Sequence, residues 1–147
     1  MVVRRERVLS ATPAEVWRVV SDPNRLAAWW PGVSRVEEAS AEAWTTVLVS
    51  PSGKSVRADY SMVEAEEPER VLWRHEVEES PFERLLAEST TEIALSSEGQ
   101  GGTRVRVTLD QRPRGWARFS PFQLRAAAGR QAEAALEGLA GLLGDES

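Results

Sequence analysis

Cysteine is absent from this 147-residue chain, and histidine and tyrosine occur only once each. Without cysteine the chain has no disulfide, no zinc–thiolate or iron–sulfur site and no cysteine nucleophile. A single histidine leaves carboxylates as the only further metal ligands, so we expect no metal and no other cofactor. No apolar run approaches the roughly 20 residues of a membrane span, and no secretory leader is recognisable. We therefore expect a cytoplasmic protein without stable membrane insertion.

Positive charge is scarce in the middle of the chain. Residues 38–98 carry fourteen acidic side chains and five basic ones, whereas the parts on either side have a small excess of arginine. Phosphate binding needs clustered positive charge, so this distribution argues against a nucleic-acid partner. The length suits one domain, residues 1–147, large enough for a filled core or a core with a cavity. Whether the domain is a monomer or a homodimer stays open.

The first third of the chain predicts a strand followed by two short helices. Apolar residues alternate over 3–9, as in a strand. Thr12-Pro13 suits the N-cap and first turn of a helix. Asp22-Pro23 ends that helix and begins a second one, predicted over 24–30. This second helix finishes in two adjacent tryptophans, Trp29 and Trp30, of which we expect one to point inward and one toward the rim.

Beyond Trp30 the apolar period changes to two and later returns to a helical one. Strands are predicted at 33–38, 43–50, 54–65, 70–78, 84–97 and 103–111. Consecutive hairpins of this kind imply an antiparallel sheet with one solvated face. A long helix is predicted over 120–143, with an apolar stripe that includes Phe122 and Ala126. Its centre is rich in alanine and glycine, which means either close packing on the sheet or space for a ligand.

Several of these features resemble the START-like, or SRPBCC, superfamily. The resemblance is carried by the Val16-Trp17 step, the Ser21-Asp22-Pro23 break, the block from Trp29 to Val33, and residues 67–74 and 102–105. The superfamily includes the birch-pollen-allergen-like and lipid-transfer proteins, and the chain is most similar to its polyketide cyclase/dehydrase-like branch. The resemblance implies an α+β helix-grip fold. In this fold a curved antiparallel sheet of about six to seven strands wraps a long C-terminal helix, with two short helices after the first strand.

His75 and Tyr60 are the two candidates for catalytic residues. Both lie on the inward face of their predicted strands, opposite the final helix. His75 could act as a general acid or base, since histidine titrates near neutral pH. Tyr60 could donate its hydroxyl to a carbonyl group. The alternatives are a structural histidine that bonds a hydroxyl or backbone group, and a tyrosine that only packs in the core.

Other candidates for ligand contact share this inward face, the rim or the final helix. They are Trp30, Met62, Trp73, Ser89, Thr91, Phe122 and Ala126. Inward hydroxyls such as those of Ser89 and Thr91 need partners, which are either a wet pocket or neighbouring strands. The aromatic side chains either pack in the core or surround a flat ligand.

Three functions follow from this reading. The first is binding of a hydrophobic small molecule (a lipid, polyketide or aromatic compound) between the sheet and the last helix, as a carrier or sensor. The second is a cofactor-free polyketide cyclase or dehydratase activity that uses His75 and Tyr60. The third is a protein-interaction module similar to Hsp90-activator-like domains, which also carry tryptophan-rich N-terminal motifs.

Overall fold

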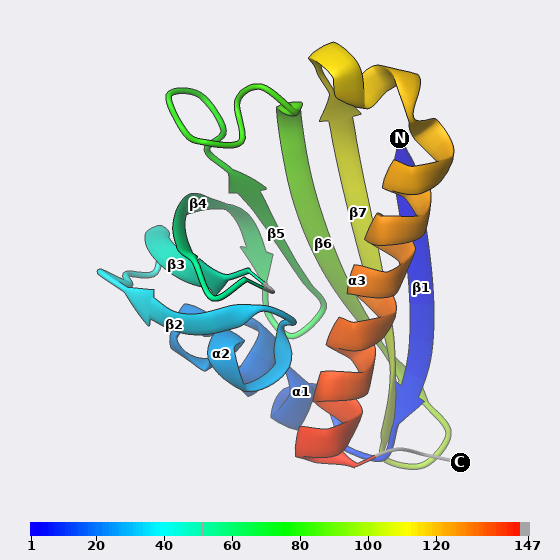
Figure 1. Cartoon of the computed structure of the whole chain (residues 1–147). Helices are drawn as coiled ribbons and strands as arrows, with labels where there is room; N and C mark the ends of the chain where they lie inside the picture. Colours follow the sequence, from blue (N-terminus) through cyan, green and yellow to red (C-terminus); the bar gives the residue numbers. More distant parts are fainter. Residues whose placement is uncertain (51, 145–147) are drawn as a thin grey trace.

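The computed structural model describes residues 1–50 and 52–144, apart from the side chain of Trp116. Seven strands form one antiparallel sheet in the order β1-β7-β6-β5-β4-β3-β2 (Figure 1). The strands are β1 (Val2–Leu9), β2 (Val33–Glu37), β3 (Ala43–Val49), β4 (Ser55–Glu66), β5 (Arg70–His75), β6 (Leu86–Glu98) and β7 (Gly102–Pro113). Each strand after β1 pairs with the next along the chain, and β1 closes the order beside β7.

The helices lie between β1 and β2 and after β7. They are α1 (Pro13–Val20), the 3-10 turn η1 (Pro23–Arg25), α2 (Leu26–Trp29), a second 3-10 turn η2 (Gly115–Phe119) and α3 (Pro121–Leu143). The Thr12 hydroxyl accepts a hydrogen bond from the Glu15 backbone N–H at 3.2 Å, and Asp22 accepts one from the Asn24 N–H at 3.0 Å. Both predicted helix starts are therefore confirmed by their caps.

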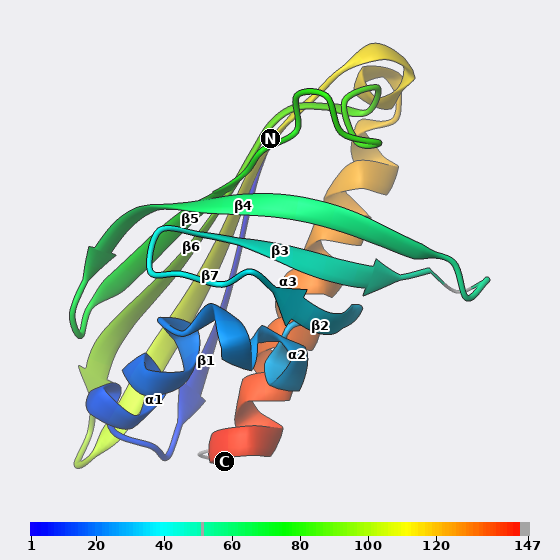
Figure 2. The ribbon, with the colours of Figure 1, turned by 90° about the vertical axis from the view of Figure 1, so that its left-hand side faces the viewer.

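The sheet curves around α3, which packs on β1 and β7 (Figure 2). The short helices α1 and α2 cover the end of the sheet near the C-terminal half of α3. This arrangement is the α+β helix-grip fold, as the sequence predicts. The middle of the concave face, formed by β3 to β6, faces α3.

Small residues let α2 and the C-terminal half of α3 approach each other closely. A Cβ atom added at Gly138 would lie 3.0 Å from both the Cα and the carbonyl carbon of Trp29. Real Cβ atoms rarely come so near to backbone, so the approach depends on glycine. Close packing thus accounts for part of the small-residue content of the helix, and it fixes the Trp29-Trp30 pair beside α3.

The segment between β5 and β6 is irregular and longer than predicted. β5 ends at His75 and not at residue 78, and β6 begins at Leu86 and not at residue 84. The Ser80 hydroxyl donates a hydrogen bond to the Val77 carbonyl at 2.5 Å and accepts one from the Phe82 N–H at 3.2 Å. These local side-chain bonds compete with the strand ladder, which explains the early end of β5.

Candidate functional site

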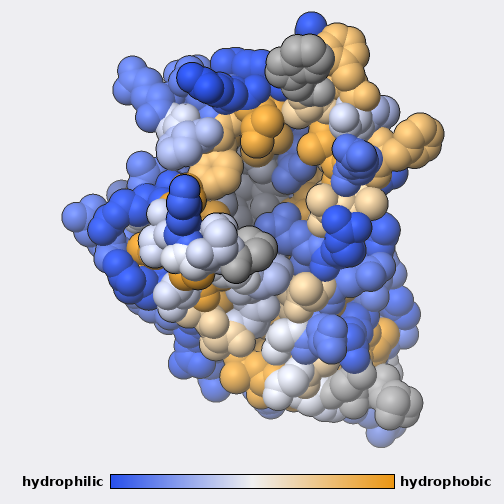
Figure 3. Space-filling model, in the orientation of Figure 1, coloured by the Kyte–Doolittle hydropathy of each residue, from blue (hydrophilic) through white to orange (hydrophobic). Residues whose placement is uncertain are grey.

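A cavity of about 160 Å³ lies between the concave face of the sheet, α2, α3 and the segment after β5. Figure 3 shows the molecule hollowed between β3 and β4 on one side and α3 on the other. Six aromatic rings line the cavity, together with aliphatic side chains and five neutral polar ones, namely Thr46, Ser89, Thr91, Gln111 and Gln131. No aspartate, glutamate, lysine or arginine is among the described residues that line it.

One wall of the cavity is a ladder of rings across three strands. In the sheet register, Trp44 of β3 pairs with Tyr60 of β4, and Tyr60 pairs with His75 of β5. The ring centroids of Trp44 and Tyr60 are 5.9 Å apart with planes 8° apart, and those of Tyr60 and His75 are 4.8 Å apart with planes 21° apart. Directly opposed residues on one face of a sheet meet in this way.

Trp73 lies at the centre of the other aromatic contacts. Its ring meets Trp29, Trp30 and Trp44 edge to face, at centroid distances of 6.5, 5.8 and 5.9 Å. Trp29 is buried, whereas Trp30 is partly exposed and lines the cavity. The two adjacent tryptophans therefore divide between core and cavity rim, as the sequence predicts.

His75 is buried, with 5% of its surface exposed. Burial lowers the pKa of its imidazole, and the opposing effect of the Asp59 and Glu76 carboxylates is smaller. The ring is therefore uncharged at neutral pH. Its Nε2 atom is buried and has no hydrogen-bond partner in the part of the chain that the structure describes.

Tyr60 remains protonated over the whole physiological range. Desolvation raises the pKa of its phenol to about 12, and a hydrogen bond with Thr46 opposes that rise. The Thr46 hydroxyl itself donates to the Ala58 carbonyl at 3.2 Å. Tyr60 thus brings a neutral hydroxyl to the wall of the cavity.

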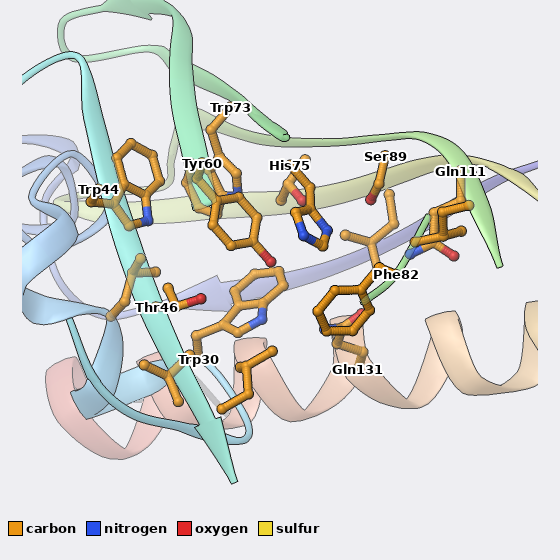
Figure 4. A pocket seen from close by; sticks show the side chains of 16 residues that line it. Trp30, Trp44, Thr46, Tyr60, Trp73, His75, Phe82, Ser89, Gln111 and Gln131 are labelled. Carbon is orange, nitrogen blue, oxygen red and sulfur yellow. The ribbon is translucent and has the colours of Figure 1, made fainter. Parts of the chain in front are cut away.

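The structure brings six of the candidate residues to the cavity, namely Trp30, Tyr60, Trp73, His75, Ser89 and Thr91 (Figure 4). Met62 does not line it. Met62 lies one inward position beyond Tyr60 on β4, opposite Trp73 in the register, and packs against the core. That the six bind a ligand stays a prediction.

Two candidates on the final helix do not lie where the sequence predicts them. Phe122 is 87% exposed, and Ala126 is exposed as well. The buried face of α3 begins at Ala128 and continues through Ala132. At 100° per residue, Ala126 lies about 120° around the helix from Ala132, so its side chain points away from the sheet.

Sequence reasoning missed several residues that line the cavity, among them Phe82, Gln111 and Gln131. Phe82 comes from the irregular segment after β5, and its ring meets His75 edge to face with centroids 4.9 Å apart. Gln111 and Gln131 lie near Phe82 (Figure 4). Gln111 follows the inward Leu109 by two positions, so the strand period contained its signal.

Two further properties of the described residues bear on the site. No helix among them is long and apolar enough to cross a membrane. A search of the same residues finds no group of three histidine, aspartate or glutamate side chains that could hold a metal ion.

A curved antiparallel sheet that grips one long helix beside an apolar cavity is the architecture of the START superfamily. Residues 1–144 match the family model described as polyketide cyclase / dehydrase and lipid transport, and the chain belongs to this family. A search of the curated proteins found no match.

Solved structures from several bacteria share the fold. A START superfamily protein from Mycobacterium smegmatis is 14% identical with a TM-score of 0.79, over 97% of this chain and 96% of that one. A protein from Chromobacterium violaceum is 24% identical with a TM-score of 0.74, over 99% and 98%. An aromatase/cyclase from a Streptomyces species is 18% identical with a TM-score of 0.77, over 97% and 93%. These identities support the fold alone.

Proposed function

We propose that the chain binds a small hydrophobic molecule in the cavity, as a carrier or sensor. The observation that carries this proposal is an aromatic cavity of about 160 Å³ with no charged side chain in its described lining. Ligand sites are typically concave and mostly apolar, with a few polar groups. An apolar cavity of about 150 Å³ is large enough to bind benzene. The expected ligand therefore places one ring, or a short apolar segment, inside.

The proposed contacts divide by chemistry. Trp30 and Trp73 offer apolar ring surface, and Tyr60 and His75 offer a stacked wall with polar edges. Ser89 and Thr91 of β6 place hydroxyl groups on the same inward face. A ligand held by these groups is enclosed mainly by rings and oriented by a few neutral hydrogen bonds.

Thermal unfolding with a panel of small aromatic and aliphatic compounds tests this proposal. A ligand that binds only the folded chain stabilises it by about 2.7 kcal/mol at 100 times its Kd. Ser89→Leu fills the cavity from β6, and Ser96→Leu makes the same change at an exposed position of the same strand. We expect the melting temperature to rise with ligand in the wild type and in Ser96→Leu, and not in Ser89→Leu. No rise with any compound, or an equal rise in both variants, contradicts the proposal.

A second candidate is a cofactor-free cyclase or dehydratase activity. The observation in its favour is the contact between Tyr60 and His75, which places a hydroxyl donor and an uncharged imidazole side by side in the cavity. The imidazole can take a proton from a carbon next to a carbonyl while the phenol polarises that carbonyl. We expect turnover of a polyketide-like substrate by the wild type and its loss in His75→Phe and in Tyr60→Phe. No turnover by the wild type contradicts the activity, and turnover that survives both substitutions contradicts the roles of the two residues.

A further inference from the structure

The imidazole of His75 contains a polar atom for which the fold supplies no partner. Nε2 is buried and forms no hydrogen bond to any described residue. The side chain lines the cavity, between Tyr60 and Phe82 (Figure 4). Buried polar atoms in folded proteins nearly always have a partner, either protein or bound water. An unpartnered nitrogen in a cavity wall is therefore a candidate contact for whatever occupies the cavity.

The surroundings of this nitrogen select against charged ligands. The described lining includes no side chain of opposite charge for a carboxylate or an ammonium group. The nearby acids Asp59 and Glu76 are exposed, and Glu76 accepts a hydrogen bond from Ser61. A charged group moved from water into such a cavity loses its hydration without compensation. The polar lining residues are all neutral, so a neutral ligand matches them.

A hydroxyl is the polar group that best fits a neutral imidazole. One ring nitrogen of neutral histidine donates a hydrogen bond and the other accepts one, depending on the tautomer. A hydroxyl both donates and accepts, so it pairs with Nε2 in either tautomer. The flat neighbours of His75 and the size of the cavity favour a hydroxyl carried by a single ring.

Phe82 packs against the ring that carries this atom. Its ring contacts the imidazole edge to face, with centroids 4.9 Å apart. Phe82 belongs to the irregular segment between β5 and β6, where the backbone is held by turns and not by a strand ladder. A ligand ring that contacts the same side of the imidazole would have to displace the Phe82 ring.

We propose that the cavity takes a neutral ring that carries a hydroxyl group, and that His75 Nε2 forms a hydrogen bond with this hydroxyl. The inference rests on the proposed binding function and narrows the class of ligand to phenols and related ring alcohols.

A matched pair of ligands tests it. 4-Methylphenol and 1,4-dimethylbenzene have nearly the same shape, and they differ in one hydroxyl in place of a methyl group. We measure the ratio of their dissociation constants in the wild type, in His75→Phe, which keeps a ring, and in Ser96→Ala, which removes an exposed hydroxyl of β6. We expect the preference for the phenol to fall about tenfold in His75→Phe, as the loss of one buried hydrogen bond predicts, and to persist in Ser96→Ala.

Because the chain has one histidine, ¹⁵N-histidine labelling reports on His75 alone. We expect the wild-type Nε2 resonance to shift when 4-methylphenol is added and not when 1,4-dimethylbenzene is added. This measurement tests the hydrogen bond to Nε2 even if His75→Phe fails to fold.

The outcomes separate the two proposals. If neither compound binds, the binding function itself fails, and the inference fails with it. If both bind but the ratio is the same in the wild type and His75→Phe, the cavity binds ligands and the role of Nε2 is wrong. An equal fall in the ratio in His75→Phe and Ser96→Ala, or an unchanged Nε2 resonance in the phenol complex, also overturns that role and leaves the binding function intact.

Discussion

The rings of Tyr60 and His75 lie nearly parallel across neighbouring strands, with centroids 4.8 Å apart and planes 21° apart. The contact follows directly from the pairing of β4 with β5, in which these two residues face each other. It joins the one tyrosine and the one histidine of the chain in a single wall of the cavity. Both groups are uncharged at neutral pH, because burial raises the pKa of one and lowers the pKa of the other.

The lowered pKa of His75 predicts a loss of stability in mild acid. In the unfolded chain the imidazole has its ordinary pKa of about 6.5. In the folded chain its pKa is lower, so below about pH 6.5 the unfolded state binds more protons than the folded state. The contribution of the uncharged His75 ring to the free energy of unfolding is therefore complete above that pH. It declines as the pH falls toward the pKa of the folded state. Urea unfolding at about pH 8 and about pH 5.5 measures the decline.

Two variants isolate the contribution of His75. His75→Phe has no titrating ring and should lose much less stability over the same interval. Glu98→Gln removes a carboxyl whose pKa is lowered by Arg104. The stability that this carboxylate contributes is lost only as the pH falls below the ordinary pKa of a glutamate. Glu98→Gln should therefore show the same decline as the wild type. A wild-type decline that persists unchanged in His75→Phe contradicts the assignment.

Trp73 should be among the most costly side chains to truncate. It is 4% exposed and contacts three other tryptophans. Trp73→Ala leaves a cavity among those rings and should lower the free energy of unfolding by about 3–5 kcal/mol. Phe122→Ala removes an aromatic ring that is 87% exposed and should change it by about 0.5 kcal/mol or less. Similar losses in the two variants, measured by urea unfolding, would contradict this account of the core.

The contact between α2 and α3 is tested by two glycines of the same helix. Gly138→Ala places a methyl group against the backbone of Trp29, whereas a Cβ at Gly141 meets nothing within 4 Å. Alanine is the better helix former by about 1 kcal/mol. Gly141→Ala should therefore raise the melting temperature and Gly138→Ala should lower it. If both substitutions stabilise the chain, then α2 and α3 are not packed as closely as described.

Regular alternation made much of the fold predictable. The inward face of β4 and β5 follows from the period of two, and it places Tyr60 and His75 together before their distance is known. The caps at Thr12 and Asp22 predict where the first helices begin, because a side-chain acceptor before proline is a local signal. These features depend on residues within a few positions of one another.

The other features of the site depend on contacts between residues that are far apart in the chain. Phe82 reaches His75 from a segment without periodicity, so its position follows from tertiary packing alone. Phe122 and Ala126 continue an apolar stripe, but the sheet covers α3 only from about Ala128 onward. Met62 has the correct face, yet it lies beyond the cavity along β4, where the β4–β5 register shifts after Met62. A face can be predicted from the sequence, whereas the extent of the cavity along that face cannot.

The most direct test of the account is to locate a bound ring in a crystal soaked with 4-bromophenol, because the bromine marks the ligand by its anomalous scattering. We expect a bromine peak inside the cavity and a hydroxyl at hydrogen-bond distance from His75 Nε2. The same soak of Ser89→Leu crystals should give no peak there. Bromine peaks found only on the surface, or an empty cavity at a concentration that saturates binding in solution, would contradict the central claim.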